Sequence, residues 1–514
     1  MLNPVMVQIG PRDSSHSNTD DGRCVRRSVG ARPMFWALPA STPCQGGGAR
    51  RGALMPLGSA AQTMSLPALT RRRVLRNAAL GTASLLSAPY VRAQYSAGKL
   101  QIGAWDHSVP AANEMFTRLC QAWAETNHVE VKIDFLTSTL MASAEAQARE
   151  GHDIIAHPTW QVVLNRHMLE PVDDIITDLI NNYGPMSPVA TYLAKSDGAW
   201  RAVPATTGSV VKPCCSRLDL YKQYCGLDLI NVFPSDDHRD HTLVDGWNWE
   251  LYLKTAEQLY NAGSPVGLPM GQFSDAVDWV GALFRSFGAV LVDDQGVIKV
   301  DSEETRAALE FIKKLMAFTP AGVYAWDDTS NNHFLISGKA SSIINPPTAW
   351  STAVHENPAV AEQCWTHDVP RGPRGRFVAE APFFYGIWDF ATNKAAAKSL
   401  LAFISAREQA ARLVAAANGG DIPPFASFYG FDTWQKVGPP PGTLYNYPPR
   451  GDTITTVPGW PARPDVALQI FNQALQPTMV AKLTRNDHTI DSVIAWAARK
   501  LEDILCLRMS HNCA

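Results

Sequence analysis

Asp301-Ser-Glu-Glu-Thr-Arg-Ala-Ala-Leu-Glu-Phe-Ile-Lys-Lys-Leu-Met316 is the stretch from which the fold of this chain can be worked out. Asp301 and Glu304 have the spacing of a capping box, which predicts a helix that begins at this point. The apolar residues that follow recur at the spacing of one buried helical face: Ala308, Phe311, Ile312, Leu315 and Met316. We therefore expect an amphipathic helix that packs on a larger core.

The residues after this helix carry a recognisable order of elements. A polar loop at residues 326–332 precedes Phe334-Leu-Ile-Ser-Gly-Lys-Ala340, which leads into the short apolar strand Ser342-Ile-Ile344. A turn, Asn345-Pro-Pro-Thr-Ala-Trp350, follows. This order resembles the centre of the family 1 extracellular solute-binding proteins, the periplasmic receptors of sugar-type ABC importers.

Other segments resemble the same family in the same order. They are Met168-Leu-Glu-Pro-Val-Asp173, Gly198-Ala-Trp-Arg-Ala-Val-Pro204, Trp247-Asn-Trp-Glu-Leu251 and Val369-Pro-Arg-Gly-Pro-Arg-Gly375. Cys214-Cys-Ser216 departs from the family, which usually has a Tyr-Asn pair there. The resemblance covers residues 98–504 and implies an α/β chain with the two-lobed periplasmic-binding-protein fold (type II), in which a hinge of crossing segments joins the lobes.

The first part of the body predicts α/β structure from its own pattern. Residues 100–105 and 129–135 alternate apolar and polar side chains like strands, and the short segment at residues 153–156 is expected to be a third, fully buried strand. Helical patterns at residues 113–125 and 141–150 separate these three segments. Strand, helix, strand, helix, strand at this spacing predicts a mostly parallel sheet.

The later segments of the chain have less regular sequence patterns. Residues 290–300 are expected to form a hairpin, and residues 398–416 one helix. Residues 428–464 are expected to form a loop rich in proline, tyrosine and tryptophan. Residues 466–475 and 490–504 are expected to be amphipathic helices.

The resemblance and these patterns together divide the chain into six parts. We expect a disordered upstream extension at 1–63 and a twin-arginine signal peptide at 64–93. Lobe 1 is expected to comprise residues 95–206 and 375–424, and lobe 2 residues 207–374 and 425–514. Each lobe would thus be assembled from two separated stretches of the chain.

The distribution of charge points away from nucleic acid. Residues 1–93 contain twelve Lys and Arg residues against three Asp and Glu residues, so the rest of the chain has a net charge near −12. A nucleic-acid-binding surface would need the opposite sign. Two lobes are also expected from the length of 514 residues, which exceeds what one ordinary core holds.

The basic head has the pattern of an export signal. Thr70-Arg-Arg-Arg-Val-Leu-Arg76 precedes an apolar run at residues 78–88, and Val91-Arg-Ala93 offers the small residues that a signal peptidase reads. We expect a soluble periplasmic protein that begins near Gln94. A membrane anchor is the alternative, but the run is short for a bilayer.

Neither catalytic nor metal chemistry is predicted. The sequence has no phosphate-binding glycine loop, no nucleophile elbow and no zinc-protease motif. The histidines and acids of residues 235–241, and His152, His157 and His167, have no specific metal-ligand spacing. The seven cysteines after the signal suggest no disulfide pairing, so buried free thiols are expected. We expect a binding protein without a cofactor, and an exported enzyme remains an alternative.

Sugars are bound by flat aromatic rings and a few hydrogen-bonding side chains in a preformed cleft. Such residues occur here after strand ends, where ligands of parallel sheets bind, and in the segments that resemble the family. The candidate aromatic platforms are Trp105, Trp160, Trp279 and Trp350, although core packing is an alternative for each. The candidate polar or backbone partners are Asp106, His107, Asp278, Asn345, Tyr385 and Gly386.

The family resemblance also implies the partners. The chain would bind a small solute, with a carbohydrate as the favoured class, and deliver it to an inner-membrane ABC permease by closing its hinge. We expect it to act as a monomer. A ligand-sensing partner of a signalling receptor is a further alternative that the sequence leaves open.

Overall fold

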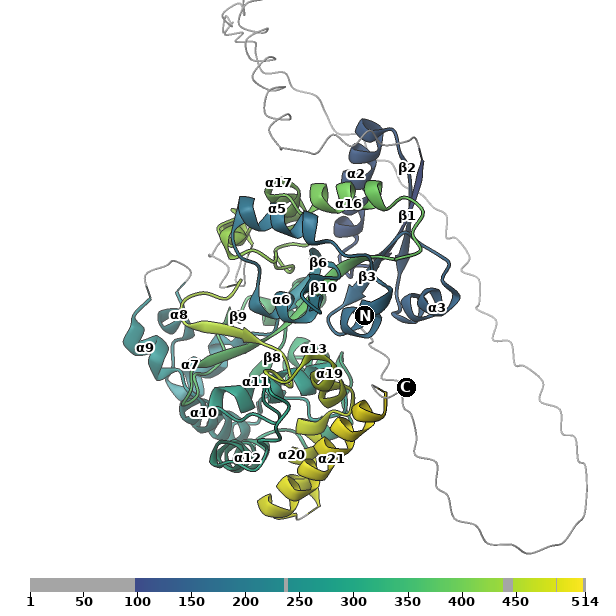
Figure 1. The fold of residues 1–514 in the computed structure, drawn as a ribbon. Coiled ribbons are helices and arrows are strands. Elements are labelled where there is room, and N and C mark those ends of the chain that lie inside the picture. The colour runs from purple at the N-terminus through teal and green to yellow at the C-terminus, as the bar shows by residue number, and fades with distance from the viewer. Residues whose placement is uncertain (1–97, 235–238, 438–446, 487, 512–514) are drawn as a thin grey trace, which may run out of the picture. The chain divides into compact units, whose positions relative to one another are not determined.

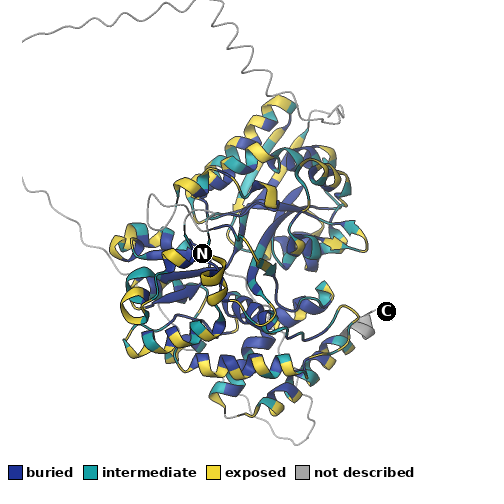
Figure 2. Cartoon of the chain, turned by 90° about the vertical axis from the view of Figure 1, so that its left-hand side faces the viewer, coloured by how far each residue is buried: buried dark blue, intermediate teal, exposed yellow. Residues whose placement is uncertain are grey.

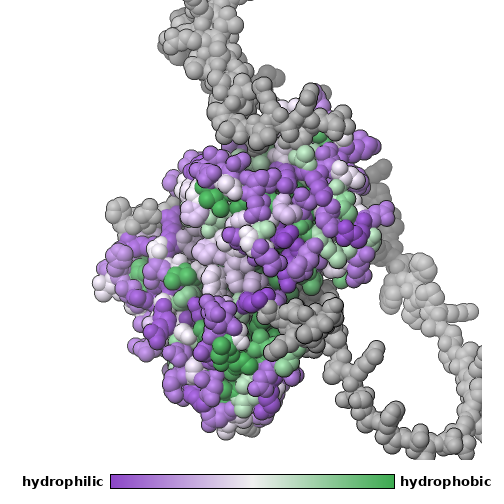
Figure 3. Space-filling view, viewed as in Figure 1, coloured by the Kyte–Doolittle hydropathy of each residue, from purple (hydrophilic) through white to green (hydrophobic). Residues whose placement is uncertain are grey.

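The computed structural model describes residues 98–511, except 235–238, 438–446 and 487. These residues belong to one compact unit. The predicted extension and signal peptide lie outside the described residues. None of the helices that are described is both long and apolar enough to span a membrane. The face of the molecule seen in Figure 3 is mostly hydrophilic, with apolar residues gathered in a few smaller areas.

The first sheet contains six strands, three of which the sequence predicts. β1 (Lys99–Trp105) pairs in parallel with β2 (Glu130–Leu136) and β3 (Ile154–Pro158). Helices α2 (Pro110–Asn127) and α3 (Leu140–Ala148) connect these strands, which confirms the expected strand–helix alternation. The order of the sheet is β11-β10-β3-β1-β2, and β6 also pairs with β10 (Figure 1).

Later parts of the chain complete this sheet. β10 (Arg376–Ile387) is antiparallel to both β3 and β6 (Val203–Val211), and β11 (Thr453–Thr456) is parallel to β10. Phe383–Ile387 thus form the last part of β10, which already begins at Arg376. β1 and β3 have mainly buried side chains, and Figure 2 shows the buried residues concentrated in the central strands.

The second sheet is smaller and antiparallel. β7 (Cys214–Arg217) lies between β8 (Ser342–Ile344) and β9 (Cys364–His367). The predicted apolar strand at residues 342–344 is thus confirmed. Helices that follow these strands or contact them include α7 (Leu218–Cys225), α13 (Ser330–Ile336) and α14 (Thr348–Glu356).

Two stretches of chain run directly between the sheets. Lys212 and Pro213 join β6 to β7, and residues 368–375 join β9 to β10. A third stretch, residues 457–463, leaves β11 and enters α19 (Pro464–Asn472), which contacts α20 (Leu475–Arg485). α20 in turn packs against helices α11 (Ser274–Phe287) and α12 (Glu303–Met316). The lobe boundaries given above stay a prediction.

The helix expected at residues 301–316 is confirmed as α12, but its cap differs. Ser302 is the N-cap, because its hydroxyl accepts a hydrogen bond from the Thr305 amide at 3.2 Å. Asp301 instead pairs with Arg306 at 2.8 Å. The polar loop after it is shorter than expected, since α13 begins at Ser330, and the predicted turn ends in α14, which contains Trp350.

Several other expectations were wrong in detail. The hairpin at residues 290–300 is reduced to one bridge between Val292 and Ile298 around a turn. The single helix at residues 398–416 is two helices, α16 (Lys394–Ile404) and α17 (Arg407–Ala416). The expected loop at residues 428–464 contains the strand β11. Two helices, α19 and α20, lie between this strand and residue 490, where only one helix was expected. The last helix, α21 (Ile490–His511), extends beyond residue 504.

The remaining elements are short or cover the sheets. They are α4 (Gln161–Asn165), η1 (Arg166–Met168), α5 (Asp173–Tyr183), α6 (Pro188–Ala194), β4 (Lys195–Ser196), β5 (Ala199–Trp200), α8 (Leu229–Val232), α9 (His241–Gly246), α10 (Trp249–Asn261), η2 (Ala321–Ala325), α15 (Pro358–Ala361), η3 (Ala426–Phe428) and α18 (Thr433–Lys436). All six cysteines among the described residues carry free thiols, and four of them are buried.

Candidate functional site

The loop after β1 carries two predicted site residues, Asp106 and His107, of which His107 is the more buried. His107 Nε2 lies 3.0 Å from Asp421 Oδ1, and its Nδ1 accepts a hydrogen bond from the Val109 amide at 2.9 Å. Burial would lower the pKa of His107, but the charge of Asp421 and the hydrogen bonds outweigh it, so this pKa is raised. Asp106 is exposed and accepts a hydrogen bond from the Asn113 side chain at 2.7 Å.

Asp421 comes from the distant loop after α17 and is almost completely buried. Its second oxygen, Oδ2, is also buried and has no hydrogen-bond partner among the described residues. The predicted site residue Tyr385 lies nearby on β10: burial raises the pKa of its phenol, and the charge of Asp421 raises it further. A buried carboxylate oxygen without a donor is costly, so this oxygen is suited to a hydroxyl donor from water or a ligand.

A second polar group lies where β6 leads into β7. The Lys212 ammonium is 2.7 Å from Asp275 Oδ1 and 2.6 Å from Asp278 Oδ2. Both acids are in the first part of α11, three residues apart, so the helix presents them on one face. All three side chains are less than a tenth exposed. Burial alone would lower the pKa of Lys212, but the two carboxylates outweigh it and raise this pKa.

This group contains more negative than positive charge. Asp328 accepts a hydrogen bond from the Ser274 hydroxyl at 2.8 Å and lies close to Asp275. Burial, together with the charge of Asp275, raises the pKa of Asp328 to about 6. Burial also raises the pKa of Asp278, although Lys212 opposes this. One ammonium therefore faces three carboxylates, two of which are easier to protonate than usual.

The same group extends to the predicted residue Asn345. The Asn331 amide donates to Asp275 Oδ2 at 3.2 Å, and the Asn345 amide donates to Asn331 at 3.4 Å and to Asn332 at 2.9 Å. Two residues that the sequence analysis selected separately, Asp278 and Asn345, are thus brought into one buried network. We call this set the lysine–aspartate network: Lys212, Asp275, Asp278, Asp328, Asn331 and Asn345.

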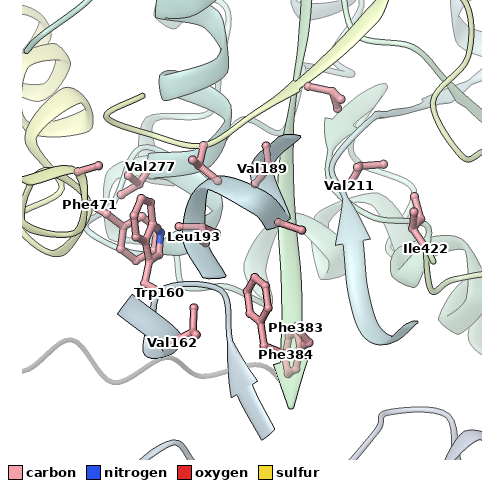
Figure 4. Packing of buried hydrophobic residues seen from close by; sticks show 14 of the residues in the cluster. Trp160, Val162, Val189, Leu193, Val211, Val277, Phe383, Phe384, Ile422 and Phe471 are labelled. Carbon is pink, nitrogen blue, oxygen red and sulfur yellow. The ribbon is translucent and has the colours of Figure 1, made fainter. Parts of the chain in front are cut away.

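Trp160 makes the most informative contact among the candidate aromatics. Its ring lies 5.5 Å from the ring of Phe471, which belongs to α19 near the end of the chain. Figure 4 shows the two rings side by side, with Val277 of α11 and Leu193 of α6 close to them. Elements attached to the first sheet therefore meet α11 and α19 at this ring.

The other candidate aromatics pack against protein neighbours. Trp105 meets Phe383 edge to face at 5.4 Å, and Tyr385 stacks on Phe116 at 5.5 Å. The Trp279 indole donates to the Pro269 carbonyl at 2.7 Å and is 1% exposed. Trp350 is buried in a separate cluster beside the second sheet.

Gly386 lies in β10, where a Cβ atom would come within 2.8 Å of the His157 ring. Its place is therefore explained by close packing inside the first sheet. The ligand roles of Gly386 and of the nine other candidates stay predictions, because the contacts that these residues make within the protein do not test ligand binding.

Sequence reasoning missed Lys212, Asp275 and Asp421. Lys212 and Pro213 end an apolar strand, and a lysine at such a position is a signal that could have been used. Asp275 precedes Asp278 by three residues, which also fits one helical face. Asp421 carried no signal, because its partner His107 is 314 positions away in the sequence. Within the described part of the chain, no group of three or more His, Cys, Asp or Glu side chains is arranged to hold a metal ion.

The comparisons with known proteins agree with this architecture. A model of the family "Bacterial extracellular solute-binding protein" matches residues 118–438. A search of curated protein sequences finds no match.

Solved structures show the same fold. Maltose-bound MalE3 of T. maritima is 19% identical, with a TM-score of 0.59, and the alignment covers 79% of this chain and 100% of that one. The GacH receptor of Streptomyces glaucescens is 16% identical, with a TM-score of 0.57 and coverage of 80% and 99%. MalE of Xanthomonas citri is 14% identical, with a TM-score of 0.61 and coverage of 80% and 98%. The chain therefore has the two-lobed, type II fold of these binding proteins.

Proposed function

This chain belongs to the bacterial extracellular solute-binding proteins, and from that premise we propose that it captures a small polar solute and delivers it to the permease of an ABC transporter. The family match over residues 118–438 is the observation that carries the proposal. Members of this family bind solutes and do not transform them, so we assign no bond-breaking step to the chain. The observed contacts favour neither an exported enzyme nor a partner of a signalling receptor.

Carbohydrate is the solute class that we favour. Structures with this fold have been solved with maltose, with α-D-tagatose and with laminaribiose. The present chain offers matching chemistry, because carboxylates and amides accept and donate hydrogen bonds to sugar hydroxyls, and aromatic rings cover the apolar faces of sugar rings. A sugar or an oligosaccharide is therefore the first ligand class to test.

We place the solute between the His107–Asp421 pair and the lysine–aspartate network. β6 links the two, because Lys212 follows directly on this strand and β6 pairs with β10, the strand that carries Tyr385. In this proposal Asp106, His107, Asp278 and Asn345 bind hydroxyl groups. Asp421 Oδ2 supplies an acceptor that has no donor among the described residues.

The aromatic candidates are assigned stacking or supporting roles in this proposal. Trp160 is the strongest of them, because its contact with Phe471 joins elements from both ends of the chain. When the lobes separate, this contact would open and free the ring to stack on a sugar. Trp105, Trp279, Trp350, Tyr385 and Gly386 then support the site through packing or backbone contacts.

Hinge closure explains how binding is passed to the permease. If residues attached to both sheets touch the solute, the closed form binds it more tightly than the open form. The solute then shifts the population toward the closed form by that difference in affinity. A permease that recognises the closed form would thereby distinguish loaded from empty protein.

Export and oligomeric state complete the proposal. We infer that the twin-arginine signal directs the chain to the periplasm, that the mature protein begins near Gln94, and that it acts as a monomer. The support is the family, whose members are extracellular, and the arginine-rich segment before an apolar run. Mass spectrometry of the exported protein would identify its first residue; an intact Arg71 on the mature species would refute this part.

A thermal-shift screen tests the function itself. The purified protein is melted with members of a library of mono- and oligosaccharides, polyols, polyamines and organic acids, and each stabilising compound is titrated calorimetrically. We expect one carbohydrate to bind with one molecule per chain. Exclusive binding of a polyamine or another non-carbohydrate would refute the sugar assignment, and chemical conversion of the compound would refute the binding-protein assignment.

A further inference from the structure

A cavity of about 370 Å³ lies beside β11, the edge strand of the first sheet. Its wall includes Pro188 of α6, Phe377 of β10, all four residues of β11, Tyr429 and Trp460, and Arg285 of α11. None of these residues belongs to the candidate solute site described above. The volume falls within the range of small-molecule binding pockets.

Arg285 is held at this cavity by the packing of α11. Gly281, one helical turn earlier on the same face, lies so close to Pro458 that an added Cβ would be 3.1 Å from it. This face of α11 therefore rests on the segment that follows β11. The Arg285 guanidinium carbon lies 5.6 Å from the centre of the Phe377 ring, in the arrangement of a cation–π contact.

Apart from the ring of Phe377, the Nε end of the guanidinium has no partner among the described residues. The Arg285 side chain is partly exposed, but its Nε atom is buried and has no hydrogen-bond acceptor among the described residues. Burial lowers the pKa of Arg285. Removing part of a charged group from water without pairing it costs free energy, so a partly buried arginine with an unpaired Nε at a cavity is suited to a counter-ion from outside the chain.

The rest of the wall supplies a hydroxyl and flat apolar surfaces. Thr453 Oγ1 is buried and also has no hydrogen-bond partner among the described residues. The Trp460 ring is fixed by stacking on Tyr192, with 5.0 Å between the ring centres. Trp460 and Phe377 thus offer apolar surfaces beside one positive charge and one hydroxyl without a partner among the described residues.

We propose that this cavity binds a small organic carboxylate, whose charged end pairs with Arg285 and Thr453 and whose apolar body lies against Trp460 and Phe377. A guanidinium matches a carboxylate with two parallel hydrogen bonds. One cation balances one negative charge, so a phosphate dianion would leave excess charge in a mostly apolar cavity. A neutral compound would leave the guanidinium unpaired.

Fluorine NMR of the purified full chain tests this proposal with three carboxylate probes, 4-fluorobenzoate, 4-fluorophenylacetate and 6-fluorohexanoate. The matched neutral probe is 4-fluorobenzamide, and inorganic phosphate serves as a competitor. We expect at least one carboxylate to broaden and shift on addition of protein, without competition by phosphate. Arg285→Gln should weaken its binding about tenfold or more, the loss expected for a charge-assisted hydrogen bond, and Thr453→Val should weaken it by a smaller factor.

Arg374→Gln is the matched control, because Arg374 lies beside the C-terminal end of α11 but is exposed and paired with Glu304. This variant should bind the probe like the wild type. The proposal is overturned if none of the three carboxylates binds at millimolar concentration, if the neutral amide binds equally well, or if Arg285→Gln leaves binding unchanged.

A melting curve separates ligand recognition from a structural role. Without ligand, Arg285→Gln should melt at or above the wild-type temperature, because it removes a partly buried charge whose Nε has no acceptor. A clear fall in the melting temperature, together with unchanged probe binding, would assign Arg285 to packing on Phe377 and would contradict the proposal.

Discussion

Replacing Lys212 by Met should destabilise the protein strongly, because it leaves the carboxylates of the lysine–aspartate network without their cation. The Lys212 ammonium is within 2.7 Å of both Asp275 and Asp278, and its side chain is 7% exposed. Solvent therefore screens these interactions little. Breaking a buried ion pair by removing one partner costs about 3–5 kcal/mol, and we expect the free energy of unfolding to fall by an amount in this range.

The loss should depend on pH with a definite sign. Without Lys212, burial and mutual repulsion raise the folded-state pKa of the carboxylates above the unfolded-state value. A group whose pKa is raised by folding favours the folded state at low pH and opposes it as pH rises through that pKa. The variant should therefore be least stable near neutral pH and should recover part of its stability as the pH falls below about 6, where Asp328 already titrates in the wild type.

Urea unfolding of ligand-free protein, followed by tryptophan fluorescence between pH 5 and 8, measures this effect. Lys299→Met is the control, since Lys299 is about half exposed and 3.7 Å from Asp293, and exposed pairs contribute less than about 1 kcal/mol. The triple variant Lys212→Met, Asp275→Asn, Asp278→Asn should regain most of the lost stability. A loss for Lys212→Met no larger than the control, or one that grows as the pH falls, would refute the reasoning.

The remaining predictions concern the ligand, the His107–Asp421 pair and export. Trp160→Ala should weaken binding of the identified solute by about 1–3 kcal/mol in calorimetry, while Trp496→Ala on α21 should not, and equal losses would remove Trp160 from the site. Because its folded-state pKa is raised, His107 stabilises the fold most below its unfolded-state pKa. The stability difference between wild type and His107→Gln should therefore shrink as the pH rises from 6 to 9, and a difference that grows would contradict this. Changing the three arginines at 71–73 to lysine should keep the precursor in the cytoplasm on cell fractionation, and normal export would refute the twin-arginine assignment.

The local elements could be predicted where one face of each was buried. β1 and β2 alternate, and α12 repeats its apolar residues at helical spacing, so the sequence alone indicated them. α20 was not predicted; it contains Pro477, which is tolerated because it occupies the first turn, where its missing amide hydrogen has no partner to lose. Trp350 was expected in a turn because prolines precede it, but they precede the first turn of α14 instead.

The candidate site was less predictable because its contacts are long-range. The pairing of Lys212 with Asp278 spans 66 positions, and the pairing of His107 with Asp421 spans 314. A pattern of neighbours in sequence cannot show either contact. Aromatic candidates were ambiguous for another reason: Trp279 and Trp350 satisfy the preference of large apolar side chains for burial, and a tryptophan has the same signature in sequence whether it packs in a core or stacks on a sugar.

The central claim is that the chain closes on a solute held between its two lobes. Small-angle X-ray scattering of the purified protein, with and without a saturating amount of the carbohydrate found in the screen, tests it most directly. We predict a smaller radius of gyration in the presence of the carbohydrate, reversed when the carbohydrate is removed by dialysis. An unchanged radius at full saturation would contradict the closure mechanism.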